Sequence, residues 1–196
     1  MNKTFAIAAM ALLAVGGASA QVQVKPVVGA GLTFGGDTIA TVYFEDDDLD
    51  DAKVHAGGLL ALHGGVELRF TDQVSMQALV GYHVDQVNAS NADVRWDRTP
   101  IEFLGHYRLT SWFRLGGGAR YTPNARLRAS GVASNDIPNI DFKPTWGSVV
   151  EGEFFPYHSI GIKLRYVNEK FKPKNIPGGQ TLDGSHGGIY VNYYFF

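Results

Sequence analysis

Two glutamates, Glu151 and Glu153, are separated by one residue in a chain of 196 residues. Paired carboxylates can divide the roles of general acid and general base when their surroundings push their pKa values apart. On a β-strand, a spacing of two places both side chains on one face. The following strand-like segment carries Lys163 and Arg165 at the same spacing, and such cations would keep both carboxylates ionised. The pattern therefore predicts ion pairs between two strands rather than a proton-transferring site.

A serine and a histidine are adjacent at Ser185 and His186, and Glu169 or Asp183 could orient the imidazole. These are the residue types of a hydrolase with an activated nucleophile. Consecutive side chains of a strand point to opposite faces, however, so the pair makes a poor dyad. We therefore expect no catalytic residues, and Ser185, His186 and Glu169 are the best candidates for a site of this kind.

The acidic segment 45–51, which contains Asp46, Asp48 and Asp50, is a candidate for a metal site. It lacks the glycine at position 6 and the glutamate at position 12 of an EF-hand loop. The six histidines show no metal-ligand spacing, and the chain has no cysteine. We predict a solvated loop without metal or cofactor. A weak contact of the three aspartates with a divalent cation is the alternative.

The composition excludes several classes of protein. Net charge is −2 without a basic excess, so nucleic acid is not an expected partner. Charged residues make up only 18% of the chain, but aromatic residues make up 12%, which is too many for a disordered chain. The absence of cysteine excludes disulfides and thiol catalysis. Beyond residue 20 there is no apolar run of about 18 residues, so we expect no transmembrane helix.

Residues 1–20 have the organisation of a secretory signal peptide. Lys3 forms a positive n-region, segment 5–15 is apolar, and Ala18-Ser19-Ala20 is a typical cleavage site. We therefore predict a signal peptide at 1–20 and one domain at 21–196. Export of a chain without cysteine suits a bacterial envelope.

The rest of the chain shows the two-residue period of β-strands and no helical period. Segments rich in aromatic and β-branched residues are separated by turn residues. We expect eight strands, at 22–34, 53–70, 74–89, 94–109, 113–130, 142–157, 160–172 and 186–196. Their connections alternate between short and long, which indicates an up-and-down order with tight turns at one end.

One face of these segments carries no charged residue, and the other carries the charges. A soluble barrel would place the apolar face in its core, whereas a membrane barrel would turn that face toward lipid. Glycines crowd the polar face, as a narrow interior with long side chains requires, and aromatic residues collect near the strand ends, as at a bilayer interface. We predict an all-β fold, an eight-stranded antiparallel up-and-down transmembrane β-barrel, with a soluble barrel as the alternative.

The last segment ends in alternating aromatic residues, with Tyr193 and Phe195 on its apolar face and Phe196 at the end. This ending resembles the terminal signature of small bacterial outer-membrane β-barrel proteins of the OmpX, OmpA-transmembrane and OmpW-like group. The resemblance implies the bacterial outer membrane as location. It also implies handling by periplasmic chaperones and the barrel-assembly machinery, with Tyr193, Phe195 and Phe196 as the assembly signal. The family usually ends in one Phe, so we interpret Phe196 as an extra residue.

An eight-stranded barrel has an interior that side chains fill, unlike the aqueous channel of a porin. Charges confined there are costly unless they are paired, so we predict an internal ion-pair network. Its expected members are Glu67, Arg69, Glu102, Arg108, Arg114, Arg120, Glu151, Glu153, Lys163 and Arg165. We interpret this network as a polar plug that fixes strand register, with a proton or ion path as the alternative.

The resemblance implies a monomer in contact with outer-membrane lipid and lipopolysaccharide. Its expected role is structural, surface-interacting or related to small solutes. Some small outer-membrane barrels are lipid A deacylases or acyltransferases, but the deacylase pattern His-x-Ser-Asn is absent here. A lipid A-modifying enzyme is therefore one alternative, and a lateral conduit for small hydrophobic molecules is another.

Overall fold

The computed structural model describes residues 22–42, 52–89, 92–174, 176 and 178–195. These residues form an all-β fold with one short 3₁₀ turn, η2 (Val132–Asn135). The predicted signal peptide, the acidic residues Asp46, Asp48 and Asp50, and the last residue Phe196 lie outside the described residues. No described helix is long and apolar enough to cross a bilayer.

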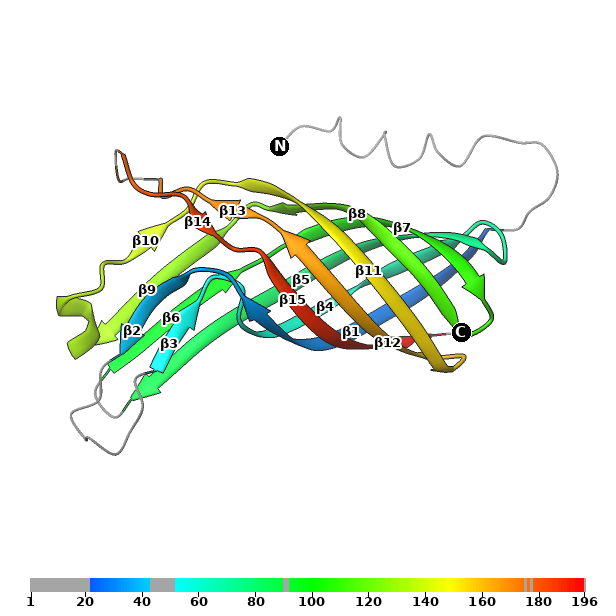
Figure 1. Cartoon of the computed structure of the whole chain (residues 1–196), viewed down its shortest axis with the longest axis horizontal. Helices are drawn as coiled ribbons and strands as arrows, with labels where there is room; N and C mark the ends of the chain where they lie inside the picture. Colours follow the sequence, from blue (N-terminus) through cyan, green and yellow to red (C-terminus); the bar gives the residue numbers. More distant parts are fainter. Residues whose placement is uncertain (1–21, 43–51, 90–91, 175, 177, 196) are drawn as a thin grey trace.

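Eight antiparallel strands close into a barrel, as predicted. They are β1 (Gln23–Gly35), β4 (Leu59–Arg69), β5 (Val74–Ala89), β7 (Ile101–Thr110), β8 (Phe113–Thr122), β11 (Thr145–Tyr157), β12 (Ile160–Asn168) and β15 (His186–Tyr194). Each strand pairs with the next along the chain, and the pairing of β1 with β15 closes the ring. The strands run obliquely around the barrel axis (Figure 1).

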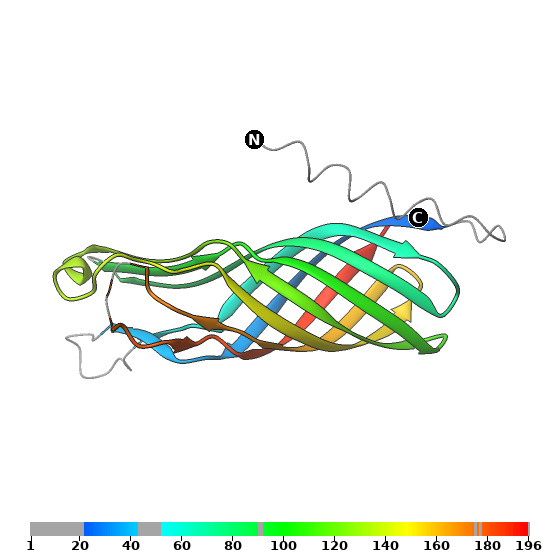
Figure 2. The ribbon, with the colours of Figure 1, turned by 90° about the horizontal axis from the view of Figure 1, so that it is seen from above.

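Beyond one end of the barrel the strands continue into an extension, which we call the lobe (Figures 1 and 2). Its strands are β2 (Thr38–Val42), β3 (Ala52–His55), β6 (Ala92–Arg98), β9 (Ala125–Gly131), β10 (Ile140–Asp141), β13 (Lys170–Phe171) and β14 (Leu182–Asp183). The long strand β5 belongs to both parts, because it pairs with β7 in the barrel and with β6 in the lobe. We call the opposite end, with its short connections, the turn end.

The structure divides several of the strands that the sequence predicts as continuous. Segment 94–109 separates into β6 and β7 around Pro100, and segment 113–130 separates into β8 and β9 around Pro123. Proline has no N–H to donate to a strand ladder, so the ladder breaks at these positions. Both breaks fall where the barrel gives way to the lobe.

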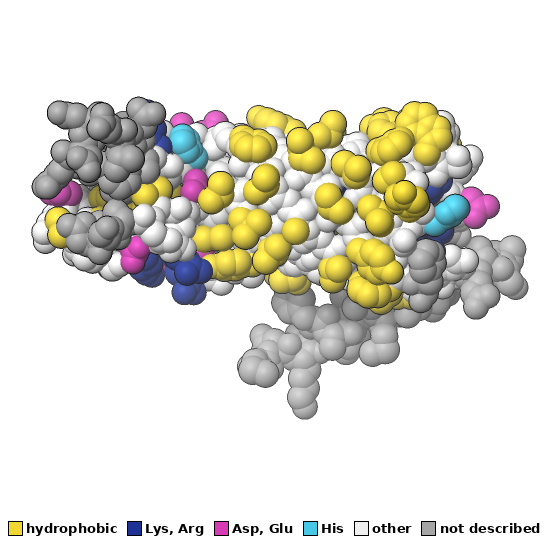
Figure 3. Space-filling view, turned by 90° about the horizontal axis from the view of Figure 1, so that it is seen from below, with side chains coloured by type: hydrophobic (Ala, Val, Ile, Leu, Met, Phe, Trp, Pro, Cys, Tyr) yellow, Lys and Arg dark blue, Asp and Glu magenta, His cyan; other side chains and the backbone are white. Residues whose placement is uncertain are grey.

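The apolar face of the barrel strands points outward, and the charged face points inward. Val150 and Leu164 are 65% and 62% exposed, whereas Glu151 is 3% exposed and Lys163 is fully buried. Apolar side chains are spread over the barrel surface in Figure 3. An apolar exterior around a polar interior is the arrangement of a barrel that stands in lipid.

Glycines on the inward face make room for the long interior side chains. A Cβ atom on Gly116 would collide with the His106 ring, and one on Gly161 would collide with the Glu153 carboxylate. The glycine-rich polar face of the sequence therefore corresponds to an interior that larger side chains already fill.

Candidate functional site: the charged interior

Glu151 on β11 lies at the centre of the interior and faces Arg165 of β12 across the strand pair. Lys163 Nζ is 2.6 Å from Glu151 Oε1, and Arg165 Nη2 is 2.9 Å from Glu151 Oε2. His106 Nε2 of β7 is 2.7 Å from Glu151 Oε1. All four side chains are buried. The two-residue spacing of the sequence thus brings Glu151, Lys163 and Arg165 together across neighbouring strands, and His106 reaches Glu151 across β8, where Gly116 lies between them.

Arg114 on β8 joins two further carboxylates nearer the turn end. Its Nη1 atom is 2.7 Å from Glu67 Oε2, and its Nη2 atom is 2.7 Å from Glu153 Oε2. The same Nη2 donates to the Tyr194 hydroxyl at 2.7 Å, and Gln77 Nε2 donates to Glu67 Oε2 at 2.9 Å. One guanidinium therefore ties β4, β8, β11 and β15 together through the barrel interior.

Arg120 on β8 forms a similar junction nearer the lobe. Its Nη1 atom is 2.9 Å from Glu102 Oε1, and its Nε atom is 3.2 Å from Glu169 Oε2. Arg165 Nη2 reaches the other Glu102 oxygen at 2.7 Å. Arg98 Nε lies 3.8 Å from Glu169 Oε1, at the boundary with the lobe. The ion pairs thus continue from the barrel centre to the lobe.

Sequence reasoning did not assign Arg98 or Glu169 to this network. Arg98 ends the lobe strand β6, and Glu169 directly follows the barrel strand β12, so both lie at the boundary between barrel and lobe. An available signal for Glu169 was its even spacing from Arg165, which keeps both side chains on one strand face.

Two predicted members lie at the turn end, outside the buried part of the network. The Arg69 side chain is 26% exposed, and its Nη2 atom is 3.3 Å from Glu67 Oε1. Arg108 makes no ion pair with a described residue, which corrects its predicted role. Instead Arg108 Nη1 donates to the Ser111 carbonyl at 2.9 Å, and its guanidinium lies 4.8 Å from the Phe155 ring centroid. The strand turns back at this point and takes Arg108 away from the interior carboxylates.

Cations and carboxylates are equally numerous in the buried network. The cations are Arg98, Arg114, Arg120, Lys163 and Arg165, and the carboxylates are Glu67, Glu102, Glu151, Glu153 and Glu169. Each carboxylate contacts at least one cation. A buried charge is tolerated when it is paired in this way, and removal of one partner leaves the other charge buried without compensation.

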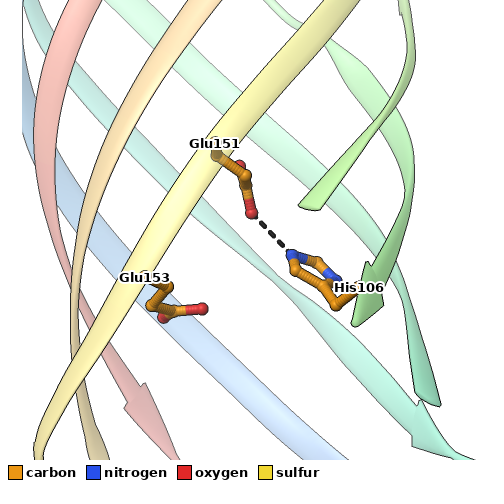
Figure 4. Close-up of side chains that lie close together, drawn as sticks. All are labelled: His106, Glu151 and Glu153. Carbon is orange, nitrogen blue, oxygen red and sulfur yellow. Dashed lines mark hydrogen bonds and ion pairs between the residues drawn. The ribbon is translucent and has the colours of Figure 1, made fainter. Parts of the chain in front are cut away.

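His106, Glu151 and Glu153 are drawn in Figure 4, and their ligand atoms lie within 4.8 Å of one another. Imidazole and carboxylate are common metal ligands. Here, however, Glu151 already contacts Lys163 and Arg165, and Glu153 contacts Arg114. A divalent cation would enter among these positive charges and would be repelled by them. The arrangement therefore favours ion pairing over metal binding.

The catalytic candidates do not form a nucleophile and base pair. His186 is buried, and its Nδ1 atom is 2.7 Å from the Gly184 carbonyl but 3.9 Å from Glu169 Oε1. Hydrogen bonds from the side chain and backbone of Ser185 lower the pKa of Asp183 in the lobe. In the described part of the chain, Ser185 makes no hydrogen bond to His186. Ser185 is thus directed to Asp183 rather than to the imidazole.

A small cavity lies in the described part of the barrel near the lobe. This cavity, at Gly81 and Pro100, has a volume of about 10 Å³, which is enough for one water molecule. Next to it, the lobe has an apolar core in which Trp96 packs edge-on against Phe142 and Phe171, with ring centroids 4.8 Å and 5.3 Å away. The charged network and this apolar core follow one another along the axis.

Comparison with known proteins agrees with this architecture. Residues 6–195 match the family model described as outer membrane protein beta-barrel domain. Neisserial surface protein A and Ail of Yersinia pestis each align with a TM-score of 0.51 at 11% identity, over 88% of this chain and 97% of theirs. Ail in complex with the heparin analogue sucrose octasulfate aligns with a TM-score of 0.50 at 12% identity, over 89% of this chain and 99% of that one.

A sequence search among curated proteins finds no match. The structural similarities are at low identity and concern the fold alone. The family match, in contrast, covers nearly the whole chain and coincides with a closed barrel that has an apolar exterior. The chain therefore belongs to the outer membrane protein beta-barrel family, as one of its small eight-stranded barrels.

Proposed function

We propose that this chain is a monomeric, non-enzymatic protein whose filled barrel holds the lobe at the cell surface, where the lobe contacts lipopolysaccharide. Family membership indicates the bacterial outer membrane. The observation that carries the proposal is the contrast between a filled interior and a projecting lobe with a cationic face. An interior filled by paired charges suits a support better than it suits a channel.

The cationic face of the lobe is formed by β9, β10 and the segments that follow β10 and β13. Hydrogen bonds from Lys143 N to the Lys172 carbonyl and from Lys174 N to the Asp141 carbonyl, both 2.8 Å, hold these segments together. The cations of the face are Arg126, Arg128, Lys143, Lys172 and Lys174. Asp141 lies among them, and its Oδ1 atom already accepts a hydrogen bond of 2.5 Å from Arg128.

A pocket of about 160 Å³ on this face is lined by Arg126, Arg128 and Lys174. Lysine and arginine bind phosphate groups strongly, and lipopolysaccharide displays several such groups next to the outer leaflet. Ail, which is similar in fold, was solved with the heparin analogue sucrose octasulfate, another anionic sugar. An anionic glycolipid is therefore the class of partner that fits the lobe best.

The proposed route to the membrane uses both ends of the chain. Residues 1–20 direct export as a signal peptide, and periplasmic chaperones then deliver the chain to the barrel-assembly machinery. Tyr193, Phe195 and Phe196 act as the assembly signal. Tyr193 and Phe195 are each 43% exposed on the outer face, where another protein can contact them. Both ends of the barrel domain then lie on the periplasmic side, and the lobe lies outside the cell.

The proposal is tested by comparing thermal unfolding in two bilayers. We expect the mature protein to unfold at a higher temperature in lipopolysaccharide-containing bilayers than in phosphatidylcholine. Replacing Lys143, Lys172 and Lys174 by Gln should reduce this difference and leave the phosphatidylcholine value unchanged. The matched control is Lys53→Gln, at an exposed lysine on β3 outside the face. An unchanged difference in the triple variant would contradict the proposal.

A lipid A-modifying enzyme is distinguished by its product. Mass spectra of lipid A from cells with and without the protein should be identical if the protein is non-enzymatic. A changed acylation pattern that disappears in His186→Ala would instead support the enzyme. A lateral conduit would require an opening in the barrel wall far larger than the 10 Å³ cavity at Pro100.

A further inference from the structure

A second pocket lies at the turn end of the barrel, away from the lobe. It has a volume of about 250 Å³, and it is lined on one side by Lys25, Arg69 and Arg108. Its other side is formed by the connections after β7 and β11, including Trp112 and His158. In the proposed orientation this pocket opens to the periplasm, at the level of the inner-leaflet headgroups.

The carboxylates of the interior are already used by other cations at this point. Glu67, the carboxylate nearest to Arg69, accepts hydrogen bonds from Arg114 at 2.7 Å and from Gln77 at 2.9 Å, whereas its distance to Arg69 is 3.3 Å. Asp72, in the exposed turn after β4, makes no ion pair with a described residue and does not line the pocket. Among the described residues, those that line the pocket include three cations and no carboxylate.

The two arginines have most of their donors available. A guanidinium has five N–H groups. Among the described residues, Arg69 donates one hydrogen bond, to Glu67, and Arg108 donates one, to the Ser111 carbonyl. These contacts leave further N–H groups of both side chains directed to solvent or to a bound acceptor.

Arg108 is also held in position. Its guanidinium lies 4.8 Å from the Phe155 ring centroid, and the hydrogen bond to Ser111 fixes its other side. Trp112 at the pocket rim packs against Phe154 with ring centroids 5.5 Å apart. Preorganised donors lose less entropy when they bind a ligand than flexible surface side chains do.

From this geometry we propose that the turn-end pocket binds a phosphate group, held between Arg69 and Arg108 with Lys25 close by. The planar fork of arginine matches the oxygen geometry of phosphate, and a phosphate monoester carries about −1.5 to −2 charges at neutral pH. This charge complements the cationic lining. A soluble periplasmic phosphate ester and an inner-leaflet phospholipid headgroup, which is a phosphodiester with one negative charge, both offer such phosphate oxygens. The proposal does not depend on the role of the lobe.

The test uses the mature protein folded in an uncharged detergent and titrated with inorganic phosphate, followed by ³¹P NMR. We expect saturable binding, weakened about tenfold or more in Arg108→Gln and in Arg69→Gln. Arg95→Gln is the matched control, because Arg95 is a partly exposed arginine in the lobe. Arg108→Gln removes no ion pair between described residues. The folded barrel of this variant should therefore show the same heat-dependent shift in gel electrophoresis as the wild type.

A second arm identifies the source of the phosphate. The protein is placed in phosphatidylcholine nanodiscs with and without phosphatidylglycerol, and retained lipid is counted by native mass spectrometry. Retention of phosphatidylglycerol that Arg108→Gln abolishes supports the proposal with a lipid headgroup as ligand. Binding of inorganic phosphate that Arg108→Gln weakens supports it with a soluble ligand. The proposal is overturned if Arg108→Gln changes neither signal, or if Arg95→Gln weakens binding equally.

Discussion

The barrel and the lobe are built from the same kind of strand pairing, yet they reverse the usual places of apolar and charged side chains. In the barrel, Leu164 points outward and Lys163 is buried. In the lobe, Trp96 and Leu127 are buried, and Arg126 is exposed on the outer face. The lobe thus has the core of a soluble protein, whereas the barrel has the arrangement that lipid demands.

Strand β5 shows this reversal within one continuous element. On its inward face, Ser75 and Gln77 in the barrel are followed by Val87, which packs against the lobe core. On its outward face, Met76 in the barrel is followed by Gln86 and Asn88, which hydrogen-bond to each other. The two-residue alternation never changes phase. Only the residue types change, because the medium outside changes from lipid to water.

The largest effect is expected from removing a charge inside the barrel. Arg114→Ala would leave Glu67 and Glu153 without their main partner, and we expect a loss of about 3–5 kcal/mol in the free energy of unfolding. Urea unfolding in lipid vesicles measures this loss. The control Arg126→Ala, on the exposed face of the lobe, should change stability by less than about 0.5 kcal/mol. Equal effects of the two substitutions would show that the interior charges are not coupled.

A comparable loss, confined to the lobe, is expected from Trp96→Ala. The Trp96 side chain packs against Phe142 and Phe171, and its Nε1 donates to the Ala56 carbonyl at 3.2 Å. Its removal should destabilise the lobe by about 3–5 kcal/mol. Faster proteolysis and hydrogen exchange in β6 and β9, with unchanged heat-modifiable migration of the barrel, is the expected result. Loss of the barrel in the same variant would mean that the two parts fold as one unit.

An intermediate loss of stability is expected when a charge is placed on the outer surface of the barrel, but not when it is placed on the outer surface of the lobe. Leu164→Arg places a charge on the lipid-facing surface and should cost about 2–4 kcal/mol if the site lies near the bilayer midplane. Asn88→Arg, on the outward face of the same kind of strand in the lobe, should be nearly neutral. Equilibrium unfolding of both variants in the same vesicles tests the contrast. Two neutral substitutions would indicate that water surrounds both surfaces.

The smallest effect is expected at the exposed pair of Arg128 and Asp141. The hydrogen bond from Arg128 lowers the pKa of Asp141. The stabilisation it gives is therefore present above the unfolded-state pKa and is lost as the pH falls through the folded-state pKa. Because the pair is exposed and screened by solvent, Asp141→Asn should leave the acid unfolding curve almost unchanged. A clear shift of that curve would assign the lobe surface a larger share of stability than we expect.

The sequence was sufficient for the barrel, since apolar and polar positions alternate along strands such as β12, and the strand ends carry aromatic residues. It also predicted the pairing of Glu151 with Lys163 and Arg165 of β12, whereas Glu153, expected to pair there too, contacts Arg114 of β8 instead. The lobe was not anticipated as a separate part. Its strands continue the barrel strands without a change of phase, and short breaks mark the boundary, such as those at Pro100 and Pro123.

The candidate site was predictable to the extent that it depends on alternation. Arg98 was missed because it ends the lobe strand β6, and Glu169 because it directly follows β12, so the alternation within one strand gives neither of them a partner. Arg108 was expected in the ion-pair network because it lies on the charged face of its strand. Its height along the axis, however, places it beside Phe155 and Ser111 at the turn end. An odd or even position along a strand determines the face on which the side chain lies, whereas the position of a residue along the barrel axis depends on the stagger between strands.

The most direct test of the central claim uses site-directed spin labels, which the absence of native cysteine makes simple. Nitroxides are attached at Leu164→Cys on the barrel and at Asn88→Cys on the lobe, and the protein is placed in lipid vesicles. Collision with oxygen, which concentrates in lipid, is compared with collision with a water-soluble nickel chelate. We predict strong oxygen and weak nickel contact at position 164, and the reverse at position 88. Strong nickel contact at both positions would contradict the account, because it would place the apolar face of the barrel in water.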